Sequence, residues 1–175
     1  MTRYRRNFVA GGTFFFTVKL ADPKSRLLVE HIGLLRTAYT DVCKMYPFET
    51  LAVCVMPNHL HSVWTLPLGD ADYSLRWRLI KSRFSAHLPA ADRSASKLRR
   101  GERGIWQRRF YEHTVRDETD LQRCADYIHF NPVRHGFAAT VRDWPFSSFH
   151  RLVRAGILPP DWGGTRETEI MNFGE

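Results

Sequence analysis

The chain has 175 residues, of which 43% are hydrophobic and 13% aromatic. A chain of this size and composition can bury a core as one domain, which excludes a disordered or fibrous protein. The formal net charge of +8 favours a polyanionic partner, most simply nucleic acid, although a basic enzyme without such a partner has the same charge.

The three cysteines, Cys43, Cys54 and Cys124, are scattered and odd in number, so they predict no disulfide framework and no Cys-x-x-Cys metal site. A reducing cytoplasm fits this pattern. The basic N-terminus is not followed by a long apolar region, so we expect no signal peptide and no transmembrane span.

The first half of the chain predicts alternating strands and helices. Residues 13–20 are rich in β-formers and follow a Gly-Gly pair, which indicates a strand. Residues 25–46 have apolar residues at helical spacing, which predicts a helix that ends at Pro47. Residues 48–55 and 59–66 then predict two strands joined by the turn Met56-Pro57-Asn58.

The second half predicts a helix over residues 73–87, a polar connection, a short strand over 112–116 and a helix that begins at Asp117 and ends before Pro132. The order β-α-β-β-α-β-α predicts an α+β fold, with an antiparallel-rich sheet and helices on one face. We expect one domain over residues 1–155 and a tail over residues 156–175.

His59 and His61 are the most informative residues. Alternate residues of a strand point to the same face, so both imidazoles project from one sheet surface. The alternative is a pair of surface histidines. The strongly apolar flanks favour a central strand, in which two buried imidazoles need partners, and this indicates a metal site.

Tyr127 and Asn131 lie one turn apart at the edge of the apolar stripe of the last helix, at the predicted border between core and solvent. If this helix lies beside the histidine strand, Asn131 can be a third metal ligand and Tyr127 a nucleophile that attacks phosphorus. Alternatively, Tyr127 packs at an interface and Asn131 ends a helix. His113, on the short strand, can approach this site or serve a structural role.

The motif Met56-Pro-Asn-His-Leu-His61, followed by Tyr127-Ile-His-Phe-Asn131-Pro132, resembles the single-tyrosine His-hydrophobic-His (HUH) transposases of bacterial insertion sequences. Further segments resemble one subgroup, the REP-associated tyrosine transposases. These segments are Tyr4-Arg-Arg with Gly11-Gly-Thr13, Trp106-Gln-x-Arg-Phe110, Asn131-Pro-Val-x-His-Gly136 and Asp143-Trp-Pro-Phe-Ser147.

The resemblance implies a ferredoxin-like HUH nuclease fold, His59 and His61 as metal ligands, and Tyr127 as the nucleophile. It implies Asn131 as third ligand, where related enzymes place Gln, which has a longer reach. The implied reaction cleaves single-stranded DNA at a REP-type hairpin and leaves a reversible 5′-phosphotyrosine. The implied cofactor is Mg²⁺ or Mn²⁺, whereas an imidazole pair alone also suits Zn²⁺. Two alternatives are a non-catalytic hairpin-binding protein and a phosphodiesterase that uses metal-bound water.

Basic residues intermixed with aromatic ones predict contacts with DNA phosphates and unpaired bases, although a solvated polar face or core packing is the alternative. The predicted contacts are Arg5, Arg6, Arg76, Arg78, Lys81, Arg83, Arg99, Arg100, Arg108, Arg109 and Trp106.

We expect a monomer, with a dimer as the alternative, in the bacterial cytoplasm with the nucleoid. The mixed charge of the tail motivates a further hypothesis, that Arg166–Glu175 modulates access to the site.

Overall fold

The computed structural model describes residues 7–164 and Phe173. Four antiparallel strands form one sheet in the order β2-β3-β1-β4. The strands are β1 (Thr13–Lys19), β2 (Glu49–Val55), β3 (His59–Thr65) and β4 (Tyr111–Thr114). Helices join β1 to β2 and β3 to β4, which makes this core ferredoxin-like and confirms the predicted fold class.

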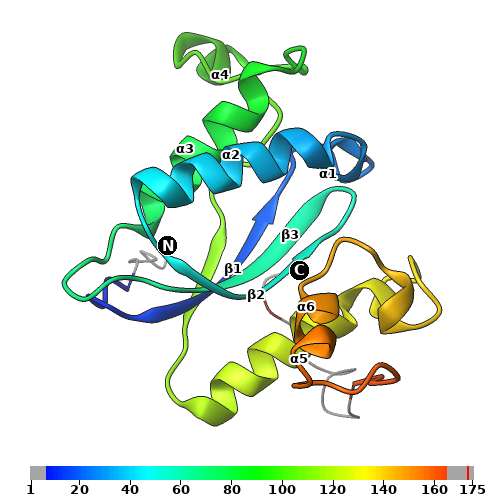
Figure 1. Ribbon diagram of the computed structural model, residues 1–175. Helices are drawn as coiled ribbons and strands as arrows, with labels where there is room; N and C mark the ends of the chain where they lie inside the picture. The colour runs from blue at the N-terminus through cyan, green and yellow to red at the C-terminus, as the bar shows by residue number, and fades with distance from the viewer. Residues whose placement is uncertain (1–6, 165–172, 174–175) are drawn as a thin grey trace.

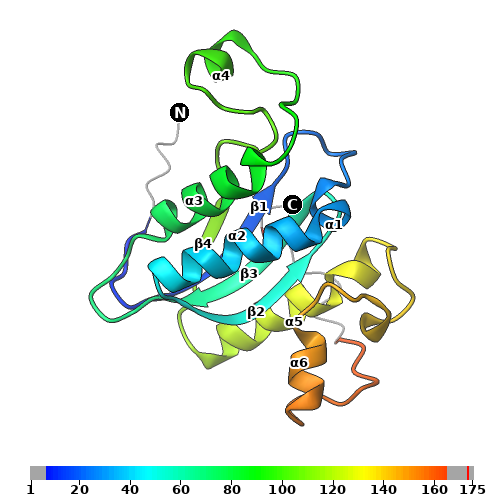
Figure 2. The same ribbon diagram turned by 45° about the horizontal axis from the view of Figure 1, so that its top comes forward.

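The helices differ in where they lie relative to the sheet. Figures 1 and 2 show α2 (Ile32–Met45) and α3 (Tyr73–Ala86) side by side over one face, and α5 (Glu118–Arg134) on the other. The short helices are α1 (Leu27–Glu30), α4 (Ala95–Arg99), the 3₁₀ helix η1 (Val141–Asp143) and α6 (Phe149–Arg154). In both views α4 lies at the end of the molecule remote from α5.

Strand β1 shows why both faces are covered. Phe14 and Phe16 enter the core beneath α2 and α3, whereas Phe15 enters the core beneath α5. All three side chains are fully buried, so a run of consecutive large apolar residues marks a strand that has helices on both sides. The structure thus adds α5 on the second face to the prediction of helices on one face.

Helix α5 begins as predicted but ends later. The Asp117 side chain accepts a hydrogen bond from the backbone N–H of Asp120 (2.8 Å) and caps the helix start. The prediction that the helix ends before Pro132 is wrong, because Pro132 lies inside the helix. Proline removes one backbone donor. Asn131 and Pro132 are both buried, however, and their packing holds the last turn in place.

The edge strand β2 does not present a bare edge. Val53 N–H donates to Ser148 Oγ (2.9 Å), and Ser148 N–H donates to the Val53 carbonyl (2.8 Å). The segment before α6 therefore closes this side of the sheet against unwanted strand pairing. In the described part of the chain, no helix is long and apolar enough to cross a membrane.

Candidate active site

His59 and His61 lie on the face of β3 that α5 covers. In the antiparallel register Thr17 of β1 is opposite His61, and Lys19 is opposite His59. Directly opposite residues point to the same face, so these side chains share a surface with Phe15. The imidazole centroids are 4.9 Å apart, and both residues are buried. The predicted side-by-side projection of the two histidines therefore matches the geometry.

Hydrogen bonds fix which imidazole nitrogen carries the proton. Asn58 donates through Nδ2 to the Pro23 carbonyl, so its Oδ1 is the acceptor 2.7 Å from His59 Nδ1. Thr17 donates its only hydroxyl hydrogen to the Phe173 carbonyl (2.7 Å), so its oxygen accepts from His61 Nδ1 at 2.9 Å. Both imidazoles therefore carry a proton on Nδ1, so in the neutral form of each ring the lone pair is on Nε2.

Tyr127 of α5 lies against the histidine strand. Its ring centroid is 5.3 Å from that of His61 and 5.9 Å from that of Phe15. Tyr127 is 1% exposed and Asn131, one turn later, is 0% exposed. The prediction that both side chains project from the border between core and solvent is therefore wrong. They are buried because the face of α5 that carries them packs against β2 and β3.

Phe173, far along the chain, lies over the same face. Its ring is 5.0 Å from Tyr127, 4.9 Å from Phe15 and 5.7 Å from His113. Together with its carbonyl contact to Thr17, the residue covers the space beside the phenol. The other residues of the hypothesis on Arg166–Glu175 lie outside the described part of the chain.

Arg134 and His135 border the site. The Arg134 guanidinium lies 5.4 Å from the centre of the Tyr127 ring, and His135 lies 5.3 Å from the His59 ring. Arg134 is the last residue of α5 and His135 follows it as the C-cap, so both lie beyond the predicted helix end. A positive charge at this place can stabilise negative charge on a phenolate or a phosphate.

Sequence reasoning missed the residues that orient the imidazoles, Thr17 and Asn58. A weak signal existed for both. Thr17 is a hydroxyl residue between the apolar Phe16 and Val18, and Asn58 adjoins His59. The contribution of Phe173 had no such signal, because its approach to Tyr127 depends on tertiary structure.

Among the predicted DNA contacts, Arg76 is a clear correction. It is 1% exposed and forms an ion pair with Asp70 (Nη2 to Oδ2, 2.6 Å). It also donates to the carbonyls of Tyr46, Pro47 and Asp72. These bonds of the guanidinium hold α3 against the preceding loops. The prediction that Arg76 contacts DNA is therefore wrong.

Trp106 is also placed in the core. It is 9% exposed, its indole N–H donates to Ser85 Oγ (3.0 Å), and its ring contacts Phe84. The predicted stacking on unpaired bases is therefore wrong, because the packing alternative holds. Lys81 lies 5.7 Å from this ring and donates to the Gln107 carbonyl.

The remaining basic residues divide between a hollow and the open surface. Arg78, Lys81, Arg100 and Arg108 line a cavity of about 920 Å³ between α3 and the segment 100–110. We call this cavity the basic hollow. Arg83, Arg99 and Arg109 are exposed, and Arg83 lies 3.8 Å from Asp41 of α2. Arg5 and Arg6 lie outside the described residues.

The chain is similar to known transposases over nearly its whole length. The family profile described as "Transposase IS200 like" matches residues 24–131. A Haemophilus influenzae protein assigned to the REP-associated tyrosine transposases is 46% identical over 97% of this chain and 98% of its own length. The REP-associated tyrosine transposase of Escherichia coli K12 is 45% identical over 94% of this chain and 92% of its own length.

A solved structure agrees with these relatives. The structure of a REP-associated tyrosine transposase bound to a REP hairpin superposes with a TM-score of 0.87 at 43% identity, covering 100% of this chain and 98% of that one. The family match, the sequence identities and the shared fold lead to one conclusion. The chain belongs to the IS200-like transposase family and, within it, to the REP-associated tyrosine transposases.

Proposed function

We propose that this protein cleaves and rejoins single-stranded DNA beside a REP-type hairpin, through a covalent bond between Tyr127 and a 5′-phosphate. The observation that carries the proposal is the placement of Tyr127 beside His61, which lies next to His59 with the Nδ1 of both imidazoles held by hydrogen bonds. The hairpin ligand comes from the solved relative, which is bound to a REP hairpin.

The residues of the site fit a divalent metal ion. His59 Nε2 and His61 Nε2 would be two ligands, and the buried Asn131 side chain would supply an amide oxygen as the third. The proposed ion is Mg²⁺ or Mn²⁺, because family resemblance favours these over Zn²⁺. Bound there, it would polarise a phosphate oxygen of the substrate. The hydrogen bonds from Nδ1 to Asn58 and Thr17 hold the imidazoles in the orientation that this requires.

Tyr127 would act as the nucleophile. Its phenolic oxygen attacks phosphorus, the phenol loses its proton, and the bond from phosphorus to the 3′-oxygen breaks. The leaving oxygen takes up a proton and becomes a free 3′-hydroxyl. One phosphate ester replaces another, so a 3′-hydroxyl can reverse the step and rejoin the strands without an energy source. Arg134 places positive charge beside the ring where negative charge develops.

The basic hollow would hold phosphates of the hairpin. It lies beside α3, on the opposite face of the sheet from α5, and the segment that lines it leads into β4. DNA that occupies both places would pass around the edge strand β4. Arg78, Arg100 and Arg108 would contribute an attraction that weakens with salt.

A 3′-end-labelled single-stranded hairpin with Mn²⁺ tests the proposal. Because the protein would bond to the 5′ end of the downstream fragment, the label should move with the protein on a denaturing gel. The adduct should disappear in Tyr127→Phe and in His59→Ala. Matched Tyr111→Phe should keep it, since Tyr111 is half-exposed on β4.

The alternatives give different results in the same assay. Cleavage without a labelled protein, retained in Tyr127→Phe, would favour metal-bound water as the nucleophile. Hairpin binding without cleavage by the wild-type protein, across Mg²⁺ and Mn²⁺, would favour a non-catalytic binding protein. Either outcome would overturn the proposed phosphotyrosine.

A further inference from the structure

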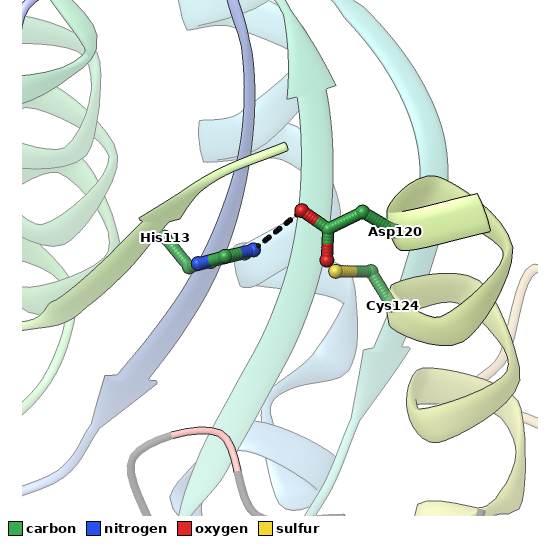
Figure 3. Close-up of side chains that lie close together, drawn as sticks. All are labelled: His113, Asp120 and Cys124. Atoms are coloured by element: carbon green, nitrogen blue, oxygen red, sulfur yellow. Dashed lines mark hydrogen bonds and ion pairs between the residues drawn. The ribbon is translucent and has the colours of Figure 1, made fainter. Parts of the chain in front are cut away.

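A second group of metal-binding side chains joins β4 to α5. His113 comes from β4, and Asp120 and Cys124 lie one turn apart on α5. One donor atom of each residue lies within 4.8 Å of the other two, and His113 Nε2 is 2.9 Å from Asp120 Oδ2. Figure 3 shows the three side chains pointing toward one another across the gap between strand and helix.

This cluster is separate from the histidine pair. His113 is opposite Phe15 of β1, whereas His61 is opposite Thr17 of the same strand. Strand β1 therefore lies between them, and two strand spacings separate His113 from His61 by about 10 Å. His113 Nε2 bonds to Asp120 of α5, whereas His61 Nδ1 bonds to Thr17 of β1, so the two imidazoles have different partners.

Asp120 has a structural role in which Cys124 takes no part. Its Oδ2 accepts from the backbone N–H and the Nε of Arg116, at 3.0 and 3.2 Å, as well as from His113. Burial alone would raise the pKa of Asp120, but these hydrogen bonds lower it overall, which keeps the carboxylate charged. In Figure 3 the second carboxylate oxygen lies next to Cys124 Sγ. The hydrogen bonds from Arg116 and His113 use the first oxygen, and Cys124 comes next to the second from within the buried cluster beneath α5.

We propose that His113, Asp120 and Cys124 form a Zn²⁺ site. Zinc bonds of about 2.0–2.3 Å in tetrahedral geometry place ligand atoms roughly 3.3–3.8 Å apart. Donors that already lie within 4.8 Å reach this spacing through small side-chain rotations. A set of thiolate, imidazole and carboxylate favours zinc over Mg²⁺ or Mn²⁺, because these prefer oxygen ligands.

The surroundings leave room for a fourth ligand. The side chains of His113 and Asp120 are 23% and 8% exposed, so water can reach the cluster from the His113 side. Arg116 would remain bonded to Asp120 Oδ2 and orient the carboxylate, whose other oxygen would bind the ion. Binding would replace the hydrogen bond between His113 and Asp120 by bonds to the metal.

Zinc at this place would tie an edge strand to the helix that carries Tyr127. Cys124 precedes Tyr127 by three residues on α5, and both side chains belong to the same buried cluster. A reactive thiol is the rival role for Cys124. Cys124 is 0% exposed, which argues against a reactive surface thiol.

Spectroscopy with Co²⁺, which takes the place of Zn²⁺, tests the proposal on the full chain. The metal-free protein should develop a near-ultraviolet band from thiolate to cobalt when Co²⁺ is added, and Zn²⁺ should abolish the band by competition. Cys124→Ser should lose the band, because a serine oxygen cannot produce it. Cys43→Ser is the matched control, since Cys43 lies on α2 and its thiol only donates to the Phe48 carbonyl.

Two further variants keep the test decisive. His113→Asn, at a partly exposed position, should weaken Zn²⁺ binding by more than about tenfold even if Cys124→Ser fails to fold. The double variant His59→Ala/His61→Ala should keep the band. No band in the wild-type protein, a band that survives in Cys124→Ser, or a band that disappears with the histidine pair would each overturn the proposal.

Discussion

The two faces of the sheet differ in what they bury. Beneath α2 and α3, aromatic rings fill the core: Trp64 stacks on Trp77 with centroids 4.2 Å apart and contacts Phe48 at 4.1 Å. Beneath α5, the same strands bury His59 and His61, each held by a hydrogen bond. Burying such polar groups costs free energy, so their concentration on one face indicates a functional site, while the other face supplies stability.

Trp64→Ala tests the stabilising face. The variant should lower the free energy of unfolding by about 3–5 kcal/mol, because it removes the ring at the centre of the aromatic core. Urea unfolding measures the change. His61→Ala on the other face should cost less stability and abolish metal-dependent cleavage. If His61→Ala were the more destabilising of the two, this division of roles would be wrong.

His129 provides a buried imidazole that lies outside the candidate site. It contacts Phe149, and its Nε2 lies 3.0 Å from Ser148 Oγ. Burial, followed by the charge of Arg151, lowers the pKa of His129 from 6.5 to about 4. Below pH 6.5 the unfolded chain binds a proton at this residue that the folded protein does not bind, so stability falls as the pH drops.

The expected loss between about pH 6.5 and pH 4 is on the order of 3 kcal/mol. Urea unfolding at several pH values should show this loss in the wild-type protein and much less of it in His129→Gln. His87→Gln, at an exposed histidine, is the control and should leave the pH dependence unchanged. Equal slopes for the wild-type protein and His129→Gln would contradict the assignment.

The sequence predicted which residues lie together on the functional face, but it did not predict that Tyr127 is buried. Alternation along β3 and helical spacing along α5 are local properties, and they correctly placed both histidines toward one surface and Tyr127 and Asn131 one turn apart. The burial of Tyr127 depends on contacts with Phe15 and Phe173, more than 40 residues away in either direction, and no local pattern contains it.

The errors have a common physical cause. Arg76, a charged residue on a predicted helix, was assigned to the solvent-exposed side. In the structure it is buried, where it forms an ion pair with Asp70 and donates hydrogen bonds to three carbonyls. The indole N–H of Trp106 similarly donates to Ser85 in the core. Proline was assigned to a helix end, yet tertiary packing carries α5 through Pro132. In each case the folded structure overrode a sound local preference.

Thr17→Val tests whether the hydrogen bond between His61 and Thr17 orients His61 for metal binding. The variant keeps the shape of the side chain but cannot accept from His61 Nδ1. The Mn²⁺ concentration for half-maximal cleavage should rise at least about tenfold. Thr13→Val, on the same strand and bonded to Thr65 instead, is the control. An unchanged Mn²⁺ requirement in Thr17→Val would remove this role.

Phe173→Ala should give the smallest effect. Its ring covers Tyr127, so DNA must displace it, and each aromatic pair contributes about 0.5–1.5 kcal/mol. Cleavage should therefore become roughly 2- to 10-fold faster. Phe137→Ala, at an exposed aromatic residue, controls for a general effect. Unchanged cleavage in Phe173→Ala would contradict the hypothesis that this end of the chain limits access.

The most direct measurement identifies the residue that bonds to DNA. The protein is incubated with the hairpin substrate and Mn²⁺, the adduct is digested with protease and nuclease, and the peptides are sequenced by mass spectrometry. We predict a nucleotide phosphate on Tyr127, joined through its phenolic oxygen. A modification on another residue such as Tyr111, or cleaved DNA without any modified peptide, would contradict the account.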